Sequence, residues 1–214
     1  MASPLSTAIN ELDSEQFQSL YGRWEPLSPA AVARILGPAG VRWYIAGGRA
    51  ARVGAAPRRH DDTDVVVRLD DLDRLRYALA DWHLWEAHDG SLRPLLPGLS
   101  LTDGREQLWI RADAHHPWQL DVQLDHGADE WVFKHDVRIR LPWDRALHTV
   151  DDVVYLRPEL ALLHKARHDR PKDRADLQAA VLDPRARAWL ASALDQLDYA
   201  EWAMVARRGM TSRP

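Results

Sequence analysis

Residues 46–67 read AGGRAARVGAAPRRHDDTDVVV, and this stretch decides the fold. A glycine pair, Gly47-Gly48, is followed by two acids, Asp62 and Asp64, which come directly before a run of valines. Because side chains alternate along a β-strand, the two acids are predicted to point to the same side. Neighbouring carboxylates repel each other unless a cation lies between them, and their hard oxygen atoms suit Mg²⁺.

The glycine pair adds a second element to this pattern. Glycine frees backbone N–H groups and can begin a helix, which is a natural binding place for a phosphate. A phosphate cradle beside metal ligands is the minimum equipment for phosphoryl or nucleotidyl transfer. The dinucleotide signature GxGxxG and the P-loop signature GxxxxGK[ST] are both absent from the sequence.

Composition narrows the class of protein. The 214 residues carry a formal net charge of −4, which argues against a large nonspecific nucleic-acid surface and leaves room for a local basic groove. The chain has no cysteine, which excludes disulfides, thiolate catalysis and cysteine zinc sites and fits a cytoplasmic location. We expect no signal peptide in residues 1–10 and no membrane segment, since no run approaches the ~20 apolar residues that a bilayer requires.

The pattern of apolar residues predicts an α+β fold, with a mixed β-sheet flanked by helices. We expect an α/β domain with a mixed sheet over residues 1–156, a C-terminal helical part over 157–206 and a mobile tail over 207–214. The predicted strands are 41–46, 63–69, 82–87, 106–111 and 117–124, followed by a hairpin of 130–134 and 137–141. The predicted helices are 8–20, 29–36, 49–53, one that Asp70 caps, 158–168, 174–182 and 184–197.

A third acid lies on one of these strands. In residues 118–124, Leu120 and Val122 alternate with polar side chains, so Asp121 is predicted to face away from the core. If this strand neighbours the one that carries Asp62, the three acids converge. Asp121 would then bind metal, accept the proton of an attacking hydroxyl, or do both. Plain solvent exposure of this polar face is the alternative.

These residues resemble the nucleotidyltransferases of the DNA polymerase β-like superfamily, most closely the aminoglycoside and lincosamide nucleotidyltransferases of its antibiotic-modifying branch. The resemblance is carried by residues 46–48 and by the run R-x-H-D-D-T-D at 58–64, and its motifs cover roughly 41–125. It implies that Asp62 and Asp64 bind two catalytic magnesium ions. It also implies that Asp121 is the third ligand or the general base, and that ATP or another nucleoside triphosphate is the co-substrate.

The C-terminal part carries a weaker resemblance, to lincosamide-type and abortive-infection toxin-type nucleotidyltransferases. It rests on residues 158–160 and 170–177 with their basic neighbours. In those proteins basic residues approach the triphosphate, which makes Lys165 and Lys172 the candidates here, since a leaving pyrophosphate needs cations. The alternative is a charged helix face on which Asp169, Asp173 and Asp176 form surface ion pairs.

One position departs from the family pattern, because Arg49 stands where relatives carry Ser or Trp. Its guanidinium could clamp a phosphate, or fold back onto the acids and weaken metal binding. The residues that we expect to hold the nucleotide are Gly47, Gly48, Arg49, Arg58, His60, Lys165 and Lys172.

The acceptor side is less defined. Acids cluster between Asp103 and Glu130 with Trp109, Trp118 and Trp131 among them, a lining that suits a cationic sugar such as an aminoglycoside and equally an ordinary wet surface. His164 and His168 have a metal-ligand spacing without a third ligand, and solvated side chains are the favoured interpretation.

The sequence therefore predicts a magnesium-dependent nucleotidyltransferase of the antibiotic-resistance type. It would move a nucleoside monophosphate, AMP from ATP, onto a hydroxyl of a small molecule and release pyrophosphate. Two alternatives stay open. One is a toxin-like enzyme that nucleotidylates tRNA or protein, and the other is a catalytically silent nucleotide-binding module, which Arg49 motivates.

Overall fold

A computed structural model describes residues 13–56, 60, 62–127 and 129–208. The chain forms two units, Met1–Trp43 with Asp61–His126 and Tyr44–His60 with Gly127–Pro214. Both contain helices and strands, so the α+β prediction is confirmed. The division differs from the one expected at residue 156, because residues 44–60 and 127–156 group with the C-terminal helices.

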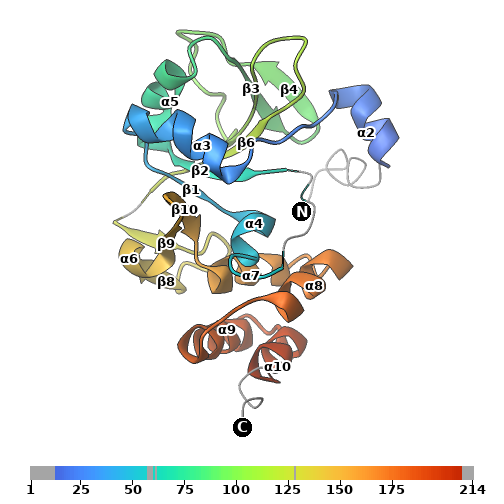
Figure 1. Ribbon diagram of the computed structural model, residues 1–214, viewed down its shortest axis with the longest axis vertical. Coiled ribbons are helices and arrows are strands. Elements are labelled where there is room, and N and C mark those ends of the chain that lie inside the picture. The colour runs from blue at the N-terminus through green and yellow to red at the C-terminus, as the bar shows by residue number, and fades with distance from the viewer. Residues whose placement is uncertain (1–12, 57–59, 61, 128, 209–214) are drawn as a thin grey trace. The chain divides into compact units, whose positions relative to one another are not determined.

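Within the residues that the structure describes, the first unit contains a five-stranded mixed sheet and three helices (Figure 1). Its strands lie in the order β4-β3-β5-β6-β2, in which β2 and β6 are parallel and the other neighbours are antiparallel. The elements are α2 (Ser14–Tyr21), α3 (Pro29–Leu36), β2 (Asp64–Arg68), α5 (Leu72–Ala78), β3 (His83–His88), β4 (Ser91–Pro94), β5 (Gln107–Arg111) and β6 (Leu120–Asp125), with 3₁₀ turns at Gly37–Ala39 and Leu69–Asp71.

Alternation along the central strands gives this sheet one apolar face. The burial of β2, β5 and β6 alternates residue by residue, as the sequence pattern predicts. The buried side chains of these strands are Val65, Val67, Leu108, Ile110, Leu120, Val122 and Leu124. The opposite face keeps the polar side chains of the same strands, and Asp64 and Asp121 belong to it.

Aromatic side chains cover part of the polar face. The Trp109 ring lies 5.9 Å from Phe17 and from Tyr21 of α2, and 5.2 Å from Trp24. The indole nitrogen of Trp118 donates to the Tyr21 carbonyl at 2.6 Å. Trp109 and Trp118 therefore anchor α2 to the sheet.

The second unit contains the remaining elements. A short sheet has the order β1-β10-β9, and the predicted hairpin is formed by β7 and β8. The elements are β1 (Trp43–Ile45), α4 (Gly47–Ala51), β7 (Glu130–Val132), β8 (Arg140–Pro142), α6 (Trp143–Ala146), β9 (Leu147–Val150), β10 (Val153–Leu156), α7 (Pro158–Ala166), α8 (Pro171–Ala179), α9 (Pro184–Gln196) and α10 (Ala200–Arg208).

The helix caps predicted from the sequence can be compared with those in the structure. Ser28 accepts a hydrogen bond from the Ala31 amide at 3.2 Å, and α3 ends at Gly37, as predicted. The prediction that Asp70 caps the next helix is wrong, since Asp71 occupies the N-cap position of α5. Its carboxylate makes no hydrogen bond to the first turn of the helix. It accepts instead a hydrogen bond from the Arg42 guanidinium at 2.7 Å. Of the helix expected over 8–20, residues 8–12 lie outside the described part of the chain.

Strand β4, helix α6, the β9–β10 hairpin and helix α10 were not predicted from the sequence. The β9–β10 hairpin turns through Asp151 and Asp152, both at positive φ (49° and 62°), where the usual Asn-Gly or Asp-Gly signal is absent. Helix α10 extends to Arg208, so the first two residues of the expected mobile tail are helical, while 209–214 lie outside the described residues.

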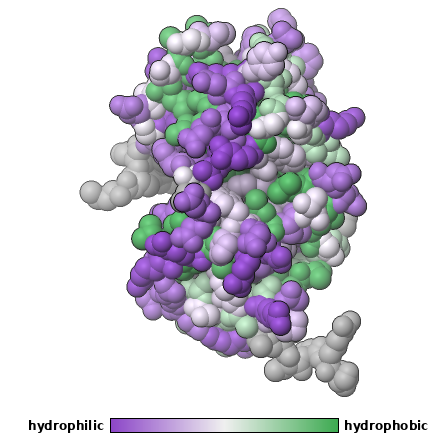
Figure 2. Space-filling model, turned by 90° about the vertical axis from the view of Figure 1, so that its left-hand side faces the viewer, coloured by the Kyte–Doolittle hydropathy of each residue, from purple (hydrophilic) through white to green (hydrophobic). Residues whose placement is uncertain are grey.

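Hydrophilic side chains predominate on the face that Figure 2 shows, and apolar side chains reach it only in separate small areas. None of the helices within the described residues has the length and apolar character that crossing a bilayer requires. Isolated exposed apolar side chains are ordinary on protein surfaces.

Candidate active site

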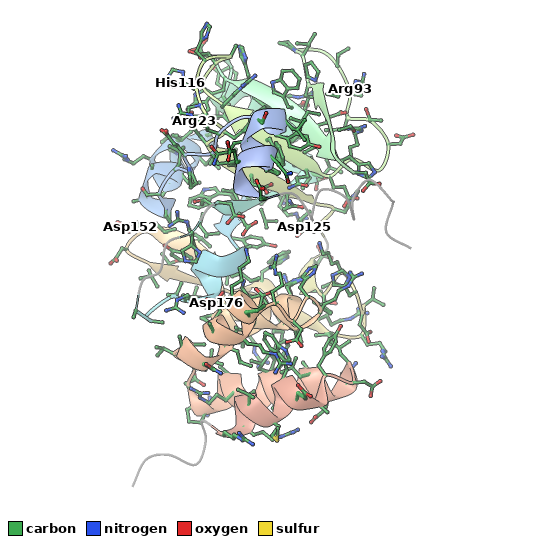
Figure 3. All side chains as sticks on the ribbon, turned by 90° about the vertical axis from the view of Figure 1, so that its right-hand side faces the viewer. Arg23, Arg93, His116, Asp125, Asp152 and Asp176 are labelled. Atoms are coloured by element: carbon green, nitrogen blue, oxygen red, sulfur yellow. The ribbon has the colours of Figure 1, made fainter. Side chains whose placement is uncertain are left out.

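Two of the predicted acids lie opposite each other. Strands β2 and β6 are parallel neighbours, and Asp64 is the register partner of Asp121. Side chains at such positions share one face of the sheet. The expectation that the strand of Asp121 neighbours the strand that follows Asp62 is therefore confirmed, and Asp125, labelled in Figure 3, marks the carboxyl end of β6.

The residue between the two first acids determines where they point. Thr63 is completely buried, and its hydroxyl donates to the Leu27 carbonyl at 2.7 Å. Because successive side chains alternate, this inward position of Thr63 directs Asp62 and Asp64 to the other side. Asp62 is exposed, just ahead of the first residue of β2.

Burial and two neighbouring acids act on the pKa of Asp121. Burial is the main reason that the pKa of Asp121 rises to about 7, and the charge of Asp64 adds to it. The more distant charge of Asp62 acts in the same direction, while hydrogen bonds from Gln107 and Gln123 oppose the rise. Asp121 therefore changes protonation close to neutral pH.

Two amide side chains hold the Asp121 carboxylate. The Gln107 amide donates to Oδ1 at 2.8 Å and to Oδ2 at 2.9 Å. The Gln123 amide donates to Oδ1 at 3.2 Å. Gln107 and Gln123 are themselves register partners on β5 and β6. Asp121 thus has an acid on one flanking strand and an amide clamp on the other.

The carboxylate oxygens of these acids are suitable ligands for a divalent cation. Carboxylate oxygens are the ligands that Mg²⁺ prefers, and a cation would relieve the repulsion that raises the Asp121 pKa. Across residues 13–56, 60, 62–127 and 129–208, no three His, Asp or Glu side chains gather into a ready-made metal site. Asp64 and Asp121 form the assembled pair, and the joining of Asp62 stays a prediction.

A cavity of about 540 Å³ opens on the first unit beside this pair. Its wall includes Gln107, Trp109 and Gln123, which are Asp121's two amide partners and its register neighbour on β5. Tyr21, Glu106 and the turn between β3 and β4 complete it. The volume lies within the ~300–1,000 Å³ range of small-molecule sites.

The glycine turn belongs to the second unit. Helix α4 begins at Gly47, whose φ of 58° is in the left-handed region that favours glycine, and Gly48 is buried. A short helix after the glycine pair was predicted, and it starts two residues earlier than expected. Arg49 and His60 are half-buried, and Arg58 lies outside the described residues. Their roles toward a nucleotide stay predictions.

The two candidate lysines differ sharply in environment. Lys165 is buried, and its ammonium lies 2.9 Å from Asp173 and 3.2 Å from Asp176. Asp176, labelled in Figure 3 beside α4, also faces Arg52 at 3.4 Å. Lys172 is exposed on the first turn of α8. Lys165 therefore joins α7 to α8 through two carboxylates, whereas Lys172 reaches solvent.

The ion pairs around Lys165 are buried, whereas surface ion pairs were predicted. Asp173 and Asp176 are completely buried. Burial alone would raise the pKa of Asp173, but hydrogen bonds from Arg170 and Lys165 outweigh it and hold the pKa at about 2. Only Asp169, which is exposed and paired with Arg174 at 2.6 Å, matches the surface pairing that was predicted.

The interpretation of His164 as a solvated side chain is wrong. Its ring packs 4.7 Å from Phe133 and 5.9 Å from Trp131. Burial, helped by the nearby charge of Lys134, lowers its pKa to about 3. His168 is exposed, as expected.

Gln107 and Gln123 were not identified as site residues from the sequence. Gln123 shares the parity of Asp121 on an alternating strand, and that was the available signal. Gln107 has none, because its contact with Asp121 depends on the register between β5 and β6.

Comparison with solved structures finds several distant matches, among them the following two. The solution structure of the antibiotic-resistance factor ANT(2'')-Ia is 14% identical, with a TM-score of 0.38 over 85% of this chain and 88% of that one. The crystal structure of an antigenic nucleotidyltransferase-like protein from Paracoccidioides brasiliensis is 15% identical, with a TM-score of 0.40 over 94% and 92%. No family model and no curated protein matches the sequence. At these identities and TM-scores the function must be derived from the residues of this chain.

Proposed function

We propose that this protein is a nucleotidyltransferase that moves a nucleoside monophosphate, AMP from ATP, onto a hydroxyl of a small molecule and releases pyrophosphate. The observation that carries the proposal is the opposed pair of Asp64 and Asp121 on parallel strands, with the Asp121 pKa raised to about 7. A carboxylate that titrates near neutral pH has the basicity that a general base needs.

Each acid has a role in this scheme. Asp62, Asp64 and Asp121 would hold Mg²⁺, with two ions expected. When bound, the metal would polarise the phosphate and neutralise charge on the departing pyrophosphate. Asp121, held in place by Gln107 and Gln123, would accept the proton of the acceptor hydroxyl as its oxygen bonds to the α-phosphorus and the bond to pyrophosphate breaks.

The nucleotide side rests on the sequence resemblance and on chemistry. Gly47, Gly48, Arg49, Arg58 and His60 remain the expected contacts of the triphosphate. Lys172 is the better-placed lysine for this role, because Lys165 already lies between two buried carboxylates. Aminoglycosides are the first acceptors to test, in keeping with the family resemblance.

The test is transfer of label from α-³²P-ATP to a panel of hydroxyl acceptors, with pyrophosphate measured in parallel. Wild type should label an acceptor only with a divalent cation present, and Asp64→Asn should lower the rate at least ~100-fold. The matched control is Asp125→Asn, on the same face of β6 opposite Arg68 rather than an acid. Labelled tRNA or protein with no small-molecule product would overturn the proposed acceptor class.

A further inference from the structure

The cavity on the first unit shares its polar wall with the Asp121 clamp. Gln107 and Gln123 line the cavity and donate to the Asp121 carboxylate at the same time. We infer that this cavity binds the hydroxyl acceptor and that Gln107 is a positioning residue, which sets the Asp121 carboxylate relative to the cavity's contents. The inference rests on the proposed function and adds the location and chemical class of the acceptor.

The hydrogen-bonding groups of the wall define what fits. Both amide N–H₂ groups are used on Asp121, and within the described residues neither amide oxygen, of Gln107 or of Gln123, accepts a hydrogen bond. The indole nitrogen of Trp109 is buried and has no partner in the same part of the chain. The amide oxygens of the two lining glutamines therefore offer acceptors for ligand O–H or N–H groups.

Charge narrows the class further. Glu106 and Asp89 line the cavity, and none of its lining residues among those described is Lys or Arg. Three cationic or titratable side chains lie close to the lining. The Arg105 guanidinium donates to Ser91 Oγ at 2.9 Å, His126 contacts Glu106 at 2.5 Å, and His88, itself a lining residue, lies 3.6 Å from Asp89. A triphosphate is disfavoured by this lining. A compound with several hydroxyls and an ammonium group satisfies both the unfilled hydrogen bonds and the charge.

The position of the cavity fits delivery to Asp121. The register places Trp109 next to Asp121 on one side and Asp64 on the other. Asp121 thus lies between Asp64 and the cavity wall. A hydroxyl that displaces the Gln107 amide from one carboxylate oxygen would occupy the place from which its proton is taken.

Binding is tested first on the full chain without nucleotide or metal, by saturation-transfer NMR. The probes are glucosamine, glucose and glucuronic acid, which share a ring and differ in charge. We expect glucosamine to bind most tightly, glucose about fivefold more weakly and glucuronic acid not measurably. Glu106→Gln should bring glucosamine to the level of glucose, while Asp81→Asn, which removes an exposed charge away from the cavity, should change nothing. Equal binding of glucuronic acid, or no effect of Glu106→Gln, would overturn the inference.

The positioning role is tested by kinetics with Gln107→Met and the control Gln119→Met. Gln119 lies two residues before Asp121, directly ahead of β6 and outside the cavity lining, and its amide oxygen accepts from the Ala112 amide. Gln107→Met should lower kcat at least tenfold and raise the acceptor KM with an unchanged KM for ATP, and Gln107→Asn should recover part of kcat. A structural effect would move both KM values and the melting temperature together.

The two proposals fail in distinguishable ways. Sugar binding that depends on Glu106, with no label transfer from ATP to any acceptor, overturns the proposed function and leaves the cavity as a binding site. Transfer that is intact in Glu106→Gln and Gln107→Met overturns the inference and leaves the proposed function standing.

Discussion

Gln107 donates to both carboxylate oxygens of Asp121, at 2.8 and 2.9 Å, from the neighbouring strand. Asp64 faces the same carboxylate from the strand on the other side. A stabilising clamp and a repelling charge therefore act on one side chain. Burial is the largest influence, and together with these two it leaves the Asp121 pKa at about 7, well above its ordinary 3.8.

The first prediction concerns this balance. A carboxyl whose pKa is higher in the folded state than in the unfolded one destabilises the fold as it ionises, so the cost begins above pH 3.8 and is complete above about pH 7. Without divalent cations, Asp121→Asn should raise the melting temperature at pH 8 and not at pH 3.5.

Differential scanning calorimetry at these two pH values measures the effect, with Asp125→Asn as the control. Asp125 faces Arg68 in the register, so its neutralisation should give no such gain at pH 8. Addition of Mg²⁺ at pH 8 should raise the melting temperature of wild type more than that of Asp121→Asn. An equal response of both proteins contradicts a role of Asp121 in cation binding.

The second prediction separates the two lysines. Lys165→Met leaves Asp173 and Asp176 buried without their shared cation, which costs about 3–5 kcal/mol. Lys172→Met, at an exposed position, should change the free energy of unfolding by less than about 0.5 kcal/mol. Urea denaturation followed by circular dichroism measures both.

The same pair of variants reports on the triphosphate. If Lys172 contacts it, Lys172→Met raises the KM for ATP while stability is unchanged. An unaltered KM would remove Lys172 from the nucleotide site.

The third prediction uses His164. Burial keeps this ring neutral in the fold until about pH 3, whereas the unfolded chain takes up its proton near pH 6.5. Stability should therefore fall as the pH drops from about 6.5 toward 3, by up to about 1.4 kcal/mol per pH unit. His164→Phe should flatten this slope in urea titrations at pH 7, 5.5 and 4. The exposed His115, replaced in the same way, serves as the control, and an equal slope in both variants would refute the assignment.

The fourth prediction addresses Thr63. Thr63→Val keeps the shape of the side chain and removes the hydrogen bond to the Leu27 carbonyl, which should cost about 1–2 kcal/mol. Thr63→Ser retains the hydroxyl and should lose less. Because Thr63 holds the strand that carries the acids, the Mg²⁺-induced rise in melting temperature should also shrink in Thr63→Val and persist in Thr63→Ser.

Local patterns in the sequence predicted the parts of the site that depend on one element. Alternation in residues 120–124 placed Asp121 on the polar face, and the glycine pair predicted the short helix α4. The register of Asp64 against Asp121 could only be assumed, because pairing between strands 57 residues apart leaves no local trace. Gln107 was missed for this reason.

The sequence also failed to predict which polar side chains are removed from solvent. Lys165 and His164 occupy helix positions that are polar in type, and periodicity assigns such residues to the surface. Lys165 is buried because its carboxylate partners come from α8. His164 is half-buried because Trp131 of β7 and Phe133, which follows it, pack against the ring. Both sets of contacts come from other elements of the fold, so periodicity within the helix cannot predict them.

Each unit is assembled from two stretches of chain, with residues 44–60 separated from their partners by the intervening 61–126. During synthesis the first unit has all its strands once residue 126 leaves the ribosome, while residues 44–60 must wait for the remainder of the chain. No single cut of the gene, at codon 156 or elsewhere, yields two fragments that each encode a whole unit. Separate expression would require residues 44–60 to be transplanted and joined to residue 127 through a linker.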